Sequence, residues 1–285
     1  MQCFDAHIHI YPGHAPSADT LIAGMEAAGI TGGAVFSYDP FFGRSIEERL
    51  ESLFAWVGEY TDRIFPFFWI HPREENVEEK IRMAVSAGVR GFKMIPTDYS
   101  VAEPDVLAVI GQIASAGKPI TLHSGILYDF EVGPSSGNNR PVLWENLLTL
   151  DCPVCFSLAH VSWPWNDECL ALLGKMRWIR GSYRRQYAEV YQEKYGRPLP
   201  EVQMLVDTAP GPGPVWREDL FRRMFVYMPS GEAFMFGTDC SAHAYSSASA
   251  AALRERDEEL CRRYATKEAT KRYFGENFLS YIGEN

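Results

Sequence analysis

The sequence predicts a (β/α)8 barrel, and three observations support this prediction. Short, continuously apolar segments alternate with longer segments that have a helical apolar period, which is typical of a parallel sheet covered by helices. Eight such units follow one another along 285 residues, close to the ~250 residues of a common barrel of this class. No glycine-rich phosphate-binding turn follows the first strand, which disfavours the alternative, an open doubly wound sheet.

Local signals separate these elements along the chain. Gly29, Gly88 and Gly117 end three helical segments, as capping glycines do. Ser45 begins another helical segment with Glu48 three residues later, which is the pattern of a capping box. The expected strands cover residues 1–10, 31–38, 64–70, 89–95, 119–123, 153–160, 177–181 and 231–238. The expected helices cover residues 19–28, 45–60, 76–87, 104–116, 142–150, 167–175, 248–264 and 266–282.

One segment departs from the short connections of such a barrel. Residues 182–230 form an insertion between the seventh and eighth expected strands, and this insertion includes the run PGPGP. Long connections in barrels are usually lids or contacts between subunits. We therefore expect a single barrel domain over residues 1–285, with a lid or a homodimer contact in the insertion.

The composition limits the kind of partner. The net charge is −10, and Lys and Arg form no cluster, which argues against nucleic acid and anionic membranes as partners. No apolar stretch is long enough to span a bilayer, and no secretory signal is recognisable at the amino terminus. The six cysteines form no disulfide framework. We expect a cytoplasmic protein that acts on a small molecule.

Chemically reactive side chains fall at the ends of the expected strands. His7 and His9 end the first strand, and residues two apart in a strand point to the same side. Further such residues are Lys93 in the fourth strand, His123 and His160 at the ends of the fifth and sixth, and Asp239 after the eighth. The carboxyl ends of barrel strands form the active site, so these groups would converge there. The alternatives are buried histidines bonded to the backbone, and a helix-capping role for Asp239.

These residues lie in motifs that resemble those of the amidohydrolase superfamily, in particular its single-barrel amidohydrolase-2 branch. The matching motifs are DAHIHI, GFKMIP, TLHSG, LAH, FGTD and the closing KRYFGENFLSYIG. The resemblance implies one divalent metal ion held by His7, His9, His123 and Asp239. Zinc suits this donor set best, and manganese, iron or nickel stay open. Lys93 would bridge a second ion, contact the substrate, or fill the barrel.

The resemblance also implies a reaction. A metal-bound water would attack the carbonyl of an amide, lactone or ester in a small, carboxylate-bearing substrate. His160 would handle the proton, and Asp239 would accept one while bound to the metal. The alternatives are a decarboxylase or hydratase with the same ligands, a lactonase without metal, and a barrel that binds a metal or ligand without turnover.

Six further residues are candidate substrate contacts. Tryptophans on expected strand-end segments would wall an apolar pocket, histidines there would contact the substrate, and arginines would bind its carboxylate. Packing roles and exposed loop positions are the alternatives. The candidates are Trp69, His71, Arg140, Trp163, Arg180 and His243.

Overall fold

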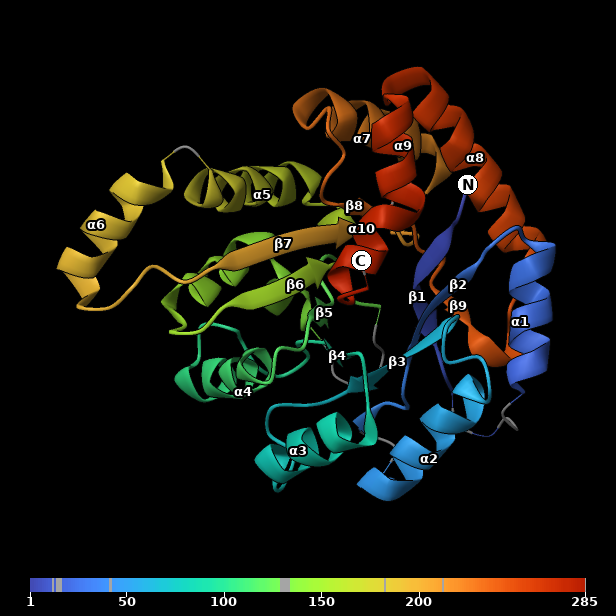
Figure 1. Ribbon diagram of the computed structural model, residues 1–285, viewed down its shortest axis with the longest axis horizontal. Coiled ribbons are helices and arrows are strands. Elements are labelled where there is room, and N and C mark those ends of the chain that lie inside the picture. The colour runs from blue at the N-terminus through green and yellow to red at the C-terminus, as the bar shows by residue number, and fades with distance from the viewer. Residues whose placement is uncertain are drawn as a thin grey trace.

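The computed structural model describes residues 1–11, 13, 17–40, 43–128, 134–181, 183–211 and 213–284. Its strands form one parallel sheet in the order β8-β7-β6-β5-β4-β3-β2-β1-β9 (Figure 1). The strands are β1 Phe4–His9, β2 Gly32–Phe36, β3 Ile64–Trp69, β4 Gly91–Met94, β5 Ile120–Leu122, β6 Val154–Leu158, β7 Val202–Asp207, β8 Phe234–Met235 and β9 Cys240–Ser241.

The sheet closes on itself through the segment that contains β8 and β9. β8 pairs with β7, whereas β9 pairs with β1. Between them, the amide of Ala6 in β1 donates to the carbonyl of Phe236 at 2.9 Å. β8 and β9 are therefore two parts of one barrel strand, interrupted at residues 236–239. This confirms the predicted α/β barrel.

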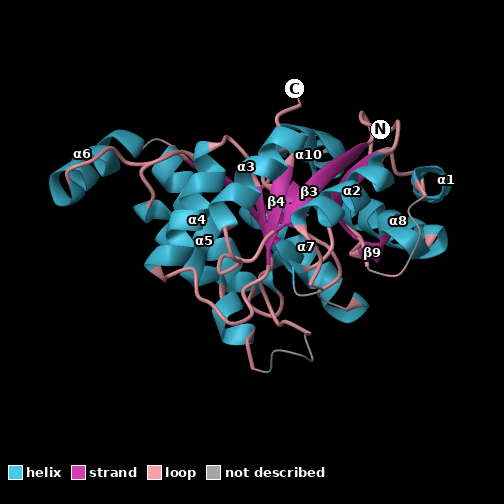
Figure 2. Ribbon diagram, turned by 90° about the horizontal axis from the view of Figure 1, so that it is seen from below, coloured by secondary structure: helices cyan, strands magenta, loops and turns pink. Residues whose placement is uncertain are grey.

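Helices surround the sheet (Figures 1 and 2). The α-helices are α1 Ala18–Ala27, α2 Ile46–Val57, α3 Val77–Ala87, α4 Pro104–Ser115, α5 Asn166–Arg180, α6 Arg184–Tyr195, α7 Pro214–Tyr227, α8 Ser247–Tyr264, α9 Lys267–Lys271 and α10 Asn277–Tyr281. The capping box predicted at Ser45 and Glu48 is present at the start of α2. The expected helix over residues 142–150 is a 3-10 helix, η3 Pro141–Thr149.

The carboxyl-terminal helix α10 packs against the amino-terminal end of the barrel. Phe278 of α10 stacks on Phe4 at the start of β1, with ring centroids 5.3 Å apart, and also contacts Phe65 near the start of β3. Tyr281 stacks on Phe67 and exchanges a hydrogen bond with Thr121 at 3.0 Å. These contacts fill one end of the barrel, so the opposite, carboxyl end is where side chains can meet a ligand.

The predicted seventh strand is wrong. Residues 177–180, expected as a strand, are the last turn of α5, because Leu172, Met176 and Ile179 continue the buried stripe of that helix. The seventh strand is β7, which lies inside the segment 182–230 that was expected to be an insertion. The extra element of this barrel is α6, which precedes β7, buries none of its residues and extends away from the barrel (Figure 1).

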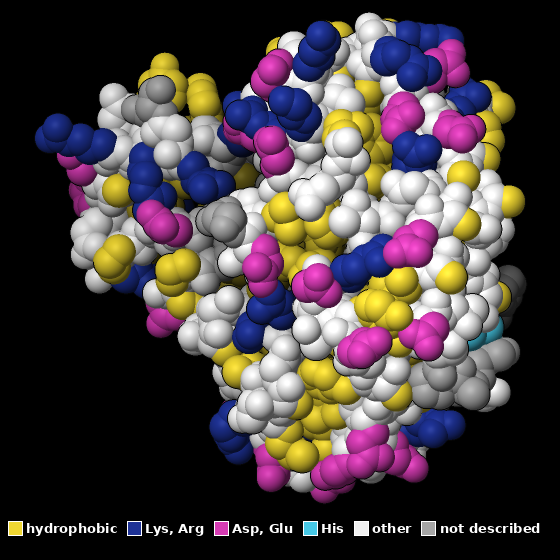
Figure 3. All heavy atoms as spheres, turned by 45° about the vertical axis from the view of Figure 1, so that its right-hand side comes forward, with side chains coloured by type: hydrophobic (Ala, Val, Ile, Leu, Met, Phe, Trp, Pro, Cys, Tyr) yellow, Lys and Arg dark blue, Asp and Glu magenta, His cyan; other side chains and the backbone are white. Residues whose placement is uncertain are grey.

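The surface carries charges of both signs. On the face in Figure 3, basic and acidic side chains are interspersed. The ion pairs of the surface include those of Arg223 with Asp167 and Asp219, both at 2.7 Å. In the described residues, no helix has the length and apolarity needed to cross a membrane. All six cysteines are free thiols.

Candidate active site at the carboxyl ends of the strands

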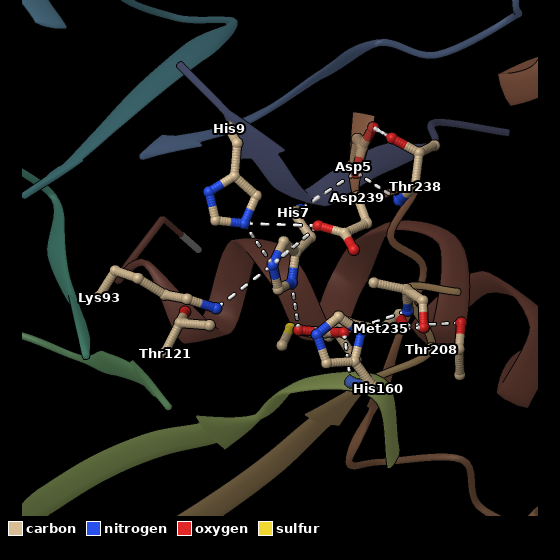
Figure 4. A network of polar contacts seen from close by, with 12 residues as sticks. Asp5, His7, His9, Lys93, Thr121, His160, Thr208, Met235, Thr238 and Asp239 are labelled. Carbon is tan, nitrogen blue, oxygen red and sulfur yellow. Dashed lines mark hydrogen bonds and ion pairs between the residues drawn. The ribbon is translucent and has the colours of Figure 1, made fainter. Parts of the chain in front are cut away.

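Three side chains meet where β1 ends and β8 leads into β9 (Figure 4). The Nε2 atoms of His7 and His9 lie 3.1 Å apart. One carboxylate oxygen of Asp239 lies 3.5 Å from the first of these nitrogens and 3.4 Å from the second. The three residues thus offer one ligand atom each within 4.8 Å of one another. This is the convergence that the strand positions predicted.

The donor atoms of this trio fit a divalent cation. Ligands bound at ~2.0–2.1 Å around tetrahedral zinc lie ~3.3–3.4 Å from one another, close to the separations observed here. The Nδ1 of His7 donates to Asp207 at 3.1 Å, so the Nε2 of neutral His7 carries a lone pair directed at the trio. Lone pairs and a carboxylate that face one another at this distance repel unless a proton or a cation lies between them. His7, His9 and Asp239 are therefore suited to hold such an ion.

Asp5 connects the two strands that carry the trio. Its buried carboxylate accepts hydrogen bonds from the amide and hydroxyl of Thr238, at 2.9 and 2.6 Å, and from the amide of His7 at 3.1 Å. Tyr245 donates a further hydrogen bond at 2.9 Å. Burial raises the pKa of Asp5 to about 6, although these hydrogen bonds lower it. Asp239 follows Thr238 with a left-handed φ of 57°, so its direction toward the histidines depends on this anchor.

Lys93 lies beside the trio, fully buried in β4. Its Nζ lies 3.3 Å from the Nε2 of His7 and 4.8 Å from the ring centroid of Phe36. Burial lowers the pKa of Lys93 to about 8, although Asp207 and Asp239 raise it. Burial likewise raises the pKa of Asp239 to about 7, against the lowering effect of Lys93. Burial thus shifts the two pKa values toward each other, down for Lys93 and up for Asp239.

His160 follows β6 and is held by the segment after β7. Its backbone amide donates to Asp207 at 3.0 Å, and its Nδ1 donates to the carbonyl of Ala209 at 3.3 Å. Its ring centroid lies 5.0 Å from that of His7. Burial is the main reason that the pKa of His160 is lowered to about 4. At neutral pH His160 is a neutral base whose Nε2 can accept a proton.

His123 follows β5 and lies next to His160, with ring centroids 5.0 Å apart. It does not belong to the compact trio of His7, His9 and Asp239. Its buried Nε2 has no hydrogen-bond partner within the described part of the chain. Such an atom is costly unless a ligand satisfies it. Its role as a metal ligand stays a prediction.

The lowered pKa of His160 predicts how stability depends on pH. The unfolded chain binds this proton near pH 6.5 and the folded chain only near pH 4, so stability from this group is complete above pH 6.5 and is lost toward pH 4. The loss should be ~3 kcal/mol. This loss is measured by denaturant unfolding of the wild-type protein and of His160→Asn, both in the presence of a chelator. The variant is the reference because it lacks the imidazole that binds this proton. A difference between them that stays constant from pH 7 to pH 4 would contradict the assignment.

Sequence reasoning missed Asp207. This fully buried carboxylate ends β7 and contacts both His7 and the backbone of His160. The missed signal is the segment VQMLVD, an apolar run that ends in an acidic residue. That signal was hidden because the segment was assigned to an insertion.

Three of the expected substrate contacts lie near the site. Trp69, at the end of β3, packs edge-on against His9 with ring centroids 5.7 Å apart. His243 packs against Tyr11 at 6.1 Å, and Tyr11 in turn stacks on His9 at 5.9 Å. Trp163 follows the turn that carries His160 and packs against Trp216 at 5.6 Å. Their contact with a substrate stays a prediction.

The other three candidates have different surroundings. Arg180 is the last residue of α5 and lines a hollow with residues at the starts of β6 and β7, at the opposite end of the barrel. Its expected place on a strand-end loop is therefore wrong. Arg140 forms an ion pair with Glu168. His71 pairs with Asp98 at 2.8 Å. Arg140 and His71 both follow strands at the carboxyl end, but these partners occupy their charged or polar groups.

Comparison with known proteins finds solved structures whose fold is similar to that of this chain. No family model and no curated protein sequence matches the chain. A probable 2-pyrone-4,6-dicarboxylic acid hydrolase from Acinetobacter baumannii, with citric acid bound, matches at a TM-score of 0.63 and 13% identity, over 99% of this chain and 100% of its own. An amidohydrolase from Burkholderia multivorans with bound zinc matches at 0.66 and 11%, over 100% of both chains. A 5-carboxyvanillate decarboxylase from Novosphingobium aromaticivorans with bound manganese matches at 0.61 and 13%, over 99% and 97%.

These similarities concern the whole barrel. They extend over almost the full length of each chain, at identities too low to transfer an activity. Two of the three structures hold a divalent metal, zinc in one and manganese in the other. Hydrolases and a decarboxylase are both represented, as in the branch that the sequence motifs resemble. The chain therefore has the TIM-type barrel fold of these enzymes.

Proposed function

We propose that this protein is a metal-dependent hydrolase of a small, carboxylate-bearing substrate with an amide, lactone or ester bond. The observation that carries the proposal is the convergence of His7, His9 and Asp239, whose ligand atoms lie 3.1 to 3.5 Å apart. The similar fold of a zinc-bound amidohydrolase and a probable dicarboxylic acid hydrolase supports it. Zinc is the first choice of metal, because two imidazoles and a carboxylate suit it.

The residues of the site have separate tasks in this proposal. His7, His9 and Asp239 hold the metal, and His123 adds a fourth ligand. A divalent ion supplies Lewis acidity and lowers the pKa of a coordinated water. His160, neutral at its lowered pKa, accepts a proton at Nε2 and can return it to the leaving group. Lys93 places a positive charge beside His7 and thereby favours negative charge that develops on the substrate.

Decarboxylation is the second candidate function. The specific observation in its favour is the similar fold of the manganese-bound 5-carboxyvanillate decarboxylase. Isotopic labelling separates the two reactions. A hydrolase incorporates oxygen from labelled water into its product, whereas a decarboxylase releases carbon dioxide and incorporates solvent hydrogen. A screen of carboxylated aromatic compounds and lactones provides the substrates for this test.

Metal content is the direct test of the site. We expect about one equivalent of divalent metal per chain for a site with this single set of ligands, and loss of it in the double variant His9→Gln, Asp239→Asn. The measurement is elemental analysis after purification without chelator. His71→Gln is the matched control, since His71 is buried outside the trio, and it should keep the metal. Wild-type protein with no bound metal would contradict the proposal. A second equivalent would assign Lys93 as the bridge between two ions.

Three further expectations stay proposals. A cytoplasmic location is supported by the six free thiols. A homodimer is supported by α6, whose exposed Tyr187 and Val190 line a hollow with residues of η3 and α5. A single domain is supported by the one continuous sheet. Sedimentation analysis of the purified protein tests the dimer.

A further inference from the structure

We propose that Asp207 is a positioning residue that sets both the metal ligand His7 and the base His160. The inference rests on the proposed function, because it assigns roles within that site. Asp207 lies at the end of β7, and its carboxylate is fully buried.

The two carboxylate oxygens of Asp207 act on different partners. Oδ2 accepts a hydrogen bond from the Nδ1 of His7 at 3.1 Å. Oδ1 accepts hydrogen bonds from the backbone amides of His160 at 3.0 Å and Ala209 at 3.1 Å. A carboxylate has no proton to donate, so the proton of neutral His7 stays on Nδ1 and its Nε2 keeps the lone pair that a metal requires.

The same carboxylate supports a strained turn. His160, Val161 and Ser162 all have left-handed φ values, of 60°, 43° and 56°. This conformation costs ~1–2 kcal/mol for each L-residue, so other contacts must hold the turn. The bond from the His160 amide to Asp207 fixes its first residue, and the Nδ1 of His160 is fixed by Ala209, two residues beyond Asp207. In both imidazoles, Nδ1 is therefore hydrogen-bonded to the segment 207–209, and Nε2 is not used in that contact.

The segment after β7 is itself fixed in place. Arg217 donates to the carbonyl of Thr208 at 2.9 Å, and Thr208 also exchanges a hydrogen bond with Tyr273. Gly211 packs closely against this turn, because a Cβ at position 211 would lie only 2.8 Å from the Cβ of His160. Asp207 therefore holds the two histidines from a rigid base, which is the requirement for precise positioning of a metal site.

Asp207→Asn tests this role. The amide oxygen can still accept from the two backbone amides, but the amide nitrogen then faces His7 and donates to its Nδ1. The proton of His7 moves to Nε2, where it competes with the metal for that nitrogen. We expect the zinc affinity of the purified protein, measured by competition with a chelator of known affinity, to fall ~10–100-fold. We also expect the nitrogen NMR signals of the His7 ring in metal-free protein to change from the Nδ1–H to the Nε2–H tautomer.

Glu74→Gln is the matched control. Glu74 is a largely buried carboxylate that pairs with Arg49 and Lys80 rather than with the site histidines or the segment after β7. It should lower stability while zinc affinity and the His7 tautomer stay unchanged. Equal loss of zinc affinity in both variants would show that Asp207 acts only on stability and would overturn the inference.

The wild-type protein provides a test that does not depend on folding of the variant. Both His7 and His160 should be Nδ1–H tautomers in metal-free protein, and an Nε2–H tautomer at His7 would overturn the inference. This result is separate from the proposed function, which fails if the wild-type protein binds no divalent metal.

Discussion

Replacing His160 with asparagine is expected to lower kcat by ~10²–10⁴-fold, the contribution of a positioned proton-transfer group, with little change in metal content. Asparagine is a conservative choice for this position. It keeps the backbone amide that donates to Asp207, and it tolerates the left-handed φ of 60° better than most residues. The variant therefore removes the imidazole while the turn is kept.

The measurement is the steady-state rate on a substrate identified by the screen, as a function of pH. If His160 transfers the proton, kcat falls much more than KM changes, and the variant loses the acidic limb that this group contributes to the wild-type profile. Glu232→Gln serves as the control, because exposed Glu232 pairs with Arg177 ahead of β8, at the opposite end of the barrel from the site. Full activity of His160→Asn would exclude His160 as the base and leave Lys93 or Asp239 for this task.

The sequence was sufficient for most of the barrel because its strands are short apolar runs with clear boundaries. Seven expected strands overlap strands of the sheet, and the residues at the ends of five of them supplied the candidate site. The same signal failed at residues 177–181. Trp178 and Ile179 are apolar, but Ile179 belongs to the helical stripe of α5, and a short apolar run does not distinguish a strand from a helix end.

That one error affected the site as well as the fold. With β7 assigned to an insertion, Asp207 had no expected position at the carboxyl end of the barrel, and Arg180 received one that it does not occupy. Other features are tertiary and have no local signal. The left-handed turn at His160 and the contact of Asp5 with Thr238, 233 residues apart, depend on neighbours that only folding brings together.

The largest stability effect is expected at the buried ion pair that anchors the segment after β7. Arg217 in α7 donates to both carboxylate oxygens of Asp257 in α8, at 2.7 and 2.6 Å. Tyr273 donates to the same carboxylate at 2.6 Å. The side chains of Arg217 and Asp257 are only 3% and 0% exposed. Asp257→Asn leaves the guanidinium buried without a counter-charge, and we expect a loss of ~3–5 kcal/mol in the free energy of unfolding.

The stability lost in Asp257→Asn is larger than the net stabilisation that the ion pair provides, and a double variant tests this difference. Arg217→Met together with Asp257→Leu removes both charges, so neither is left buried alone, and apolar side chains of similar volume fill the space. The double variant should regain most of the stability lost in Asp257→Asn. Denaturant unfolding of wild type, each single variant and the double variant completes the cycle. If the double variant is as unstable as Asp257→Asn, the bonds from Arg217 to Thr208 and from Tyr273 to Asp257 stabilise the barrel themselves, because these are the contacts that the double variant does not restore.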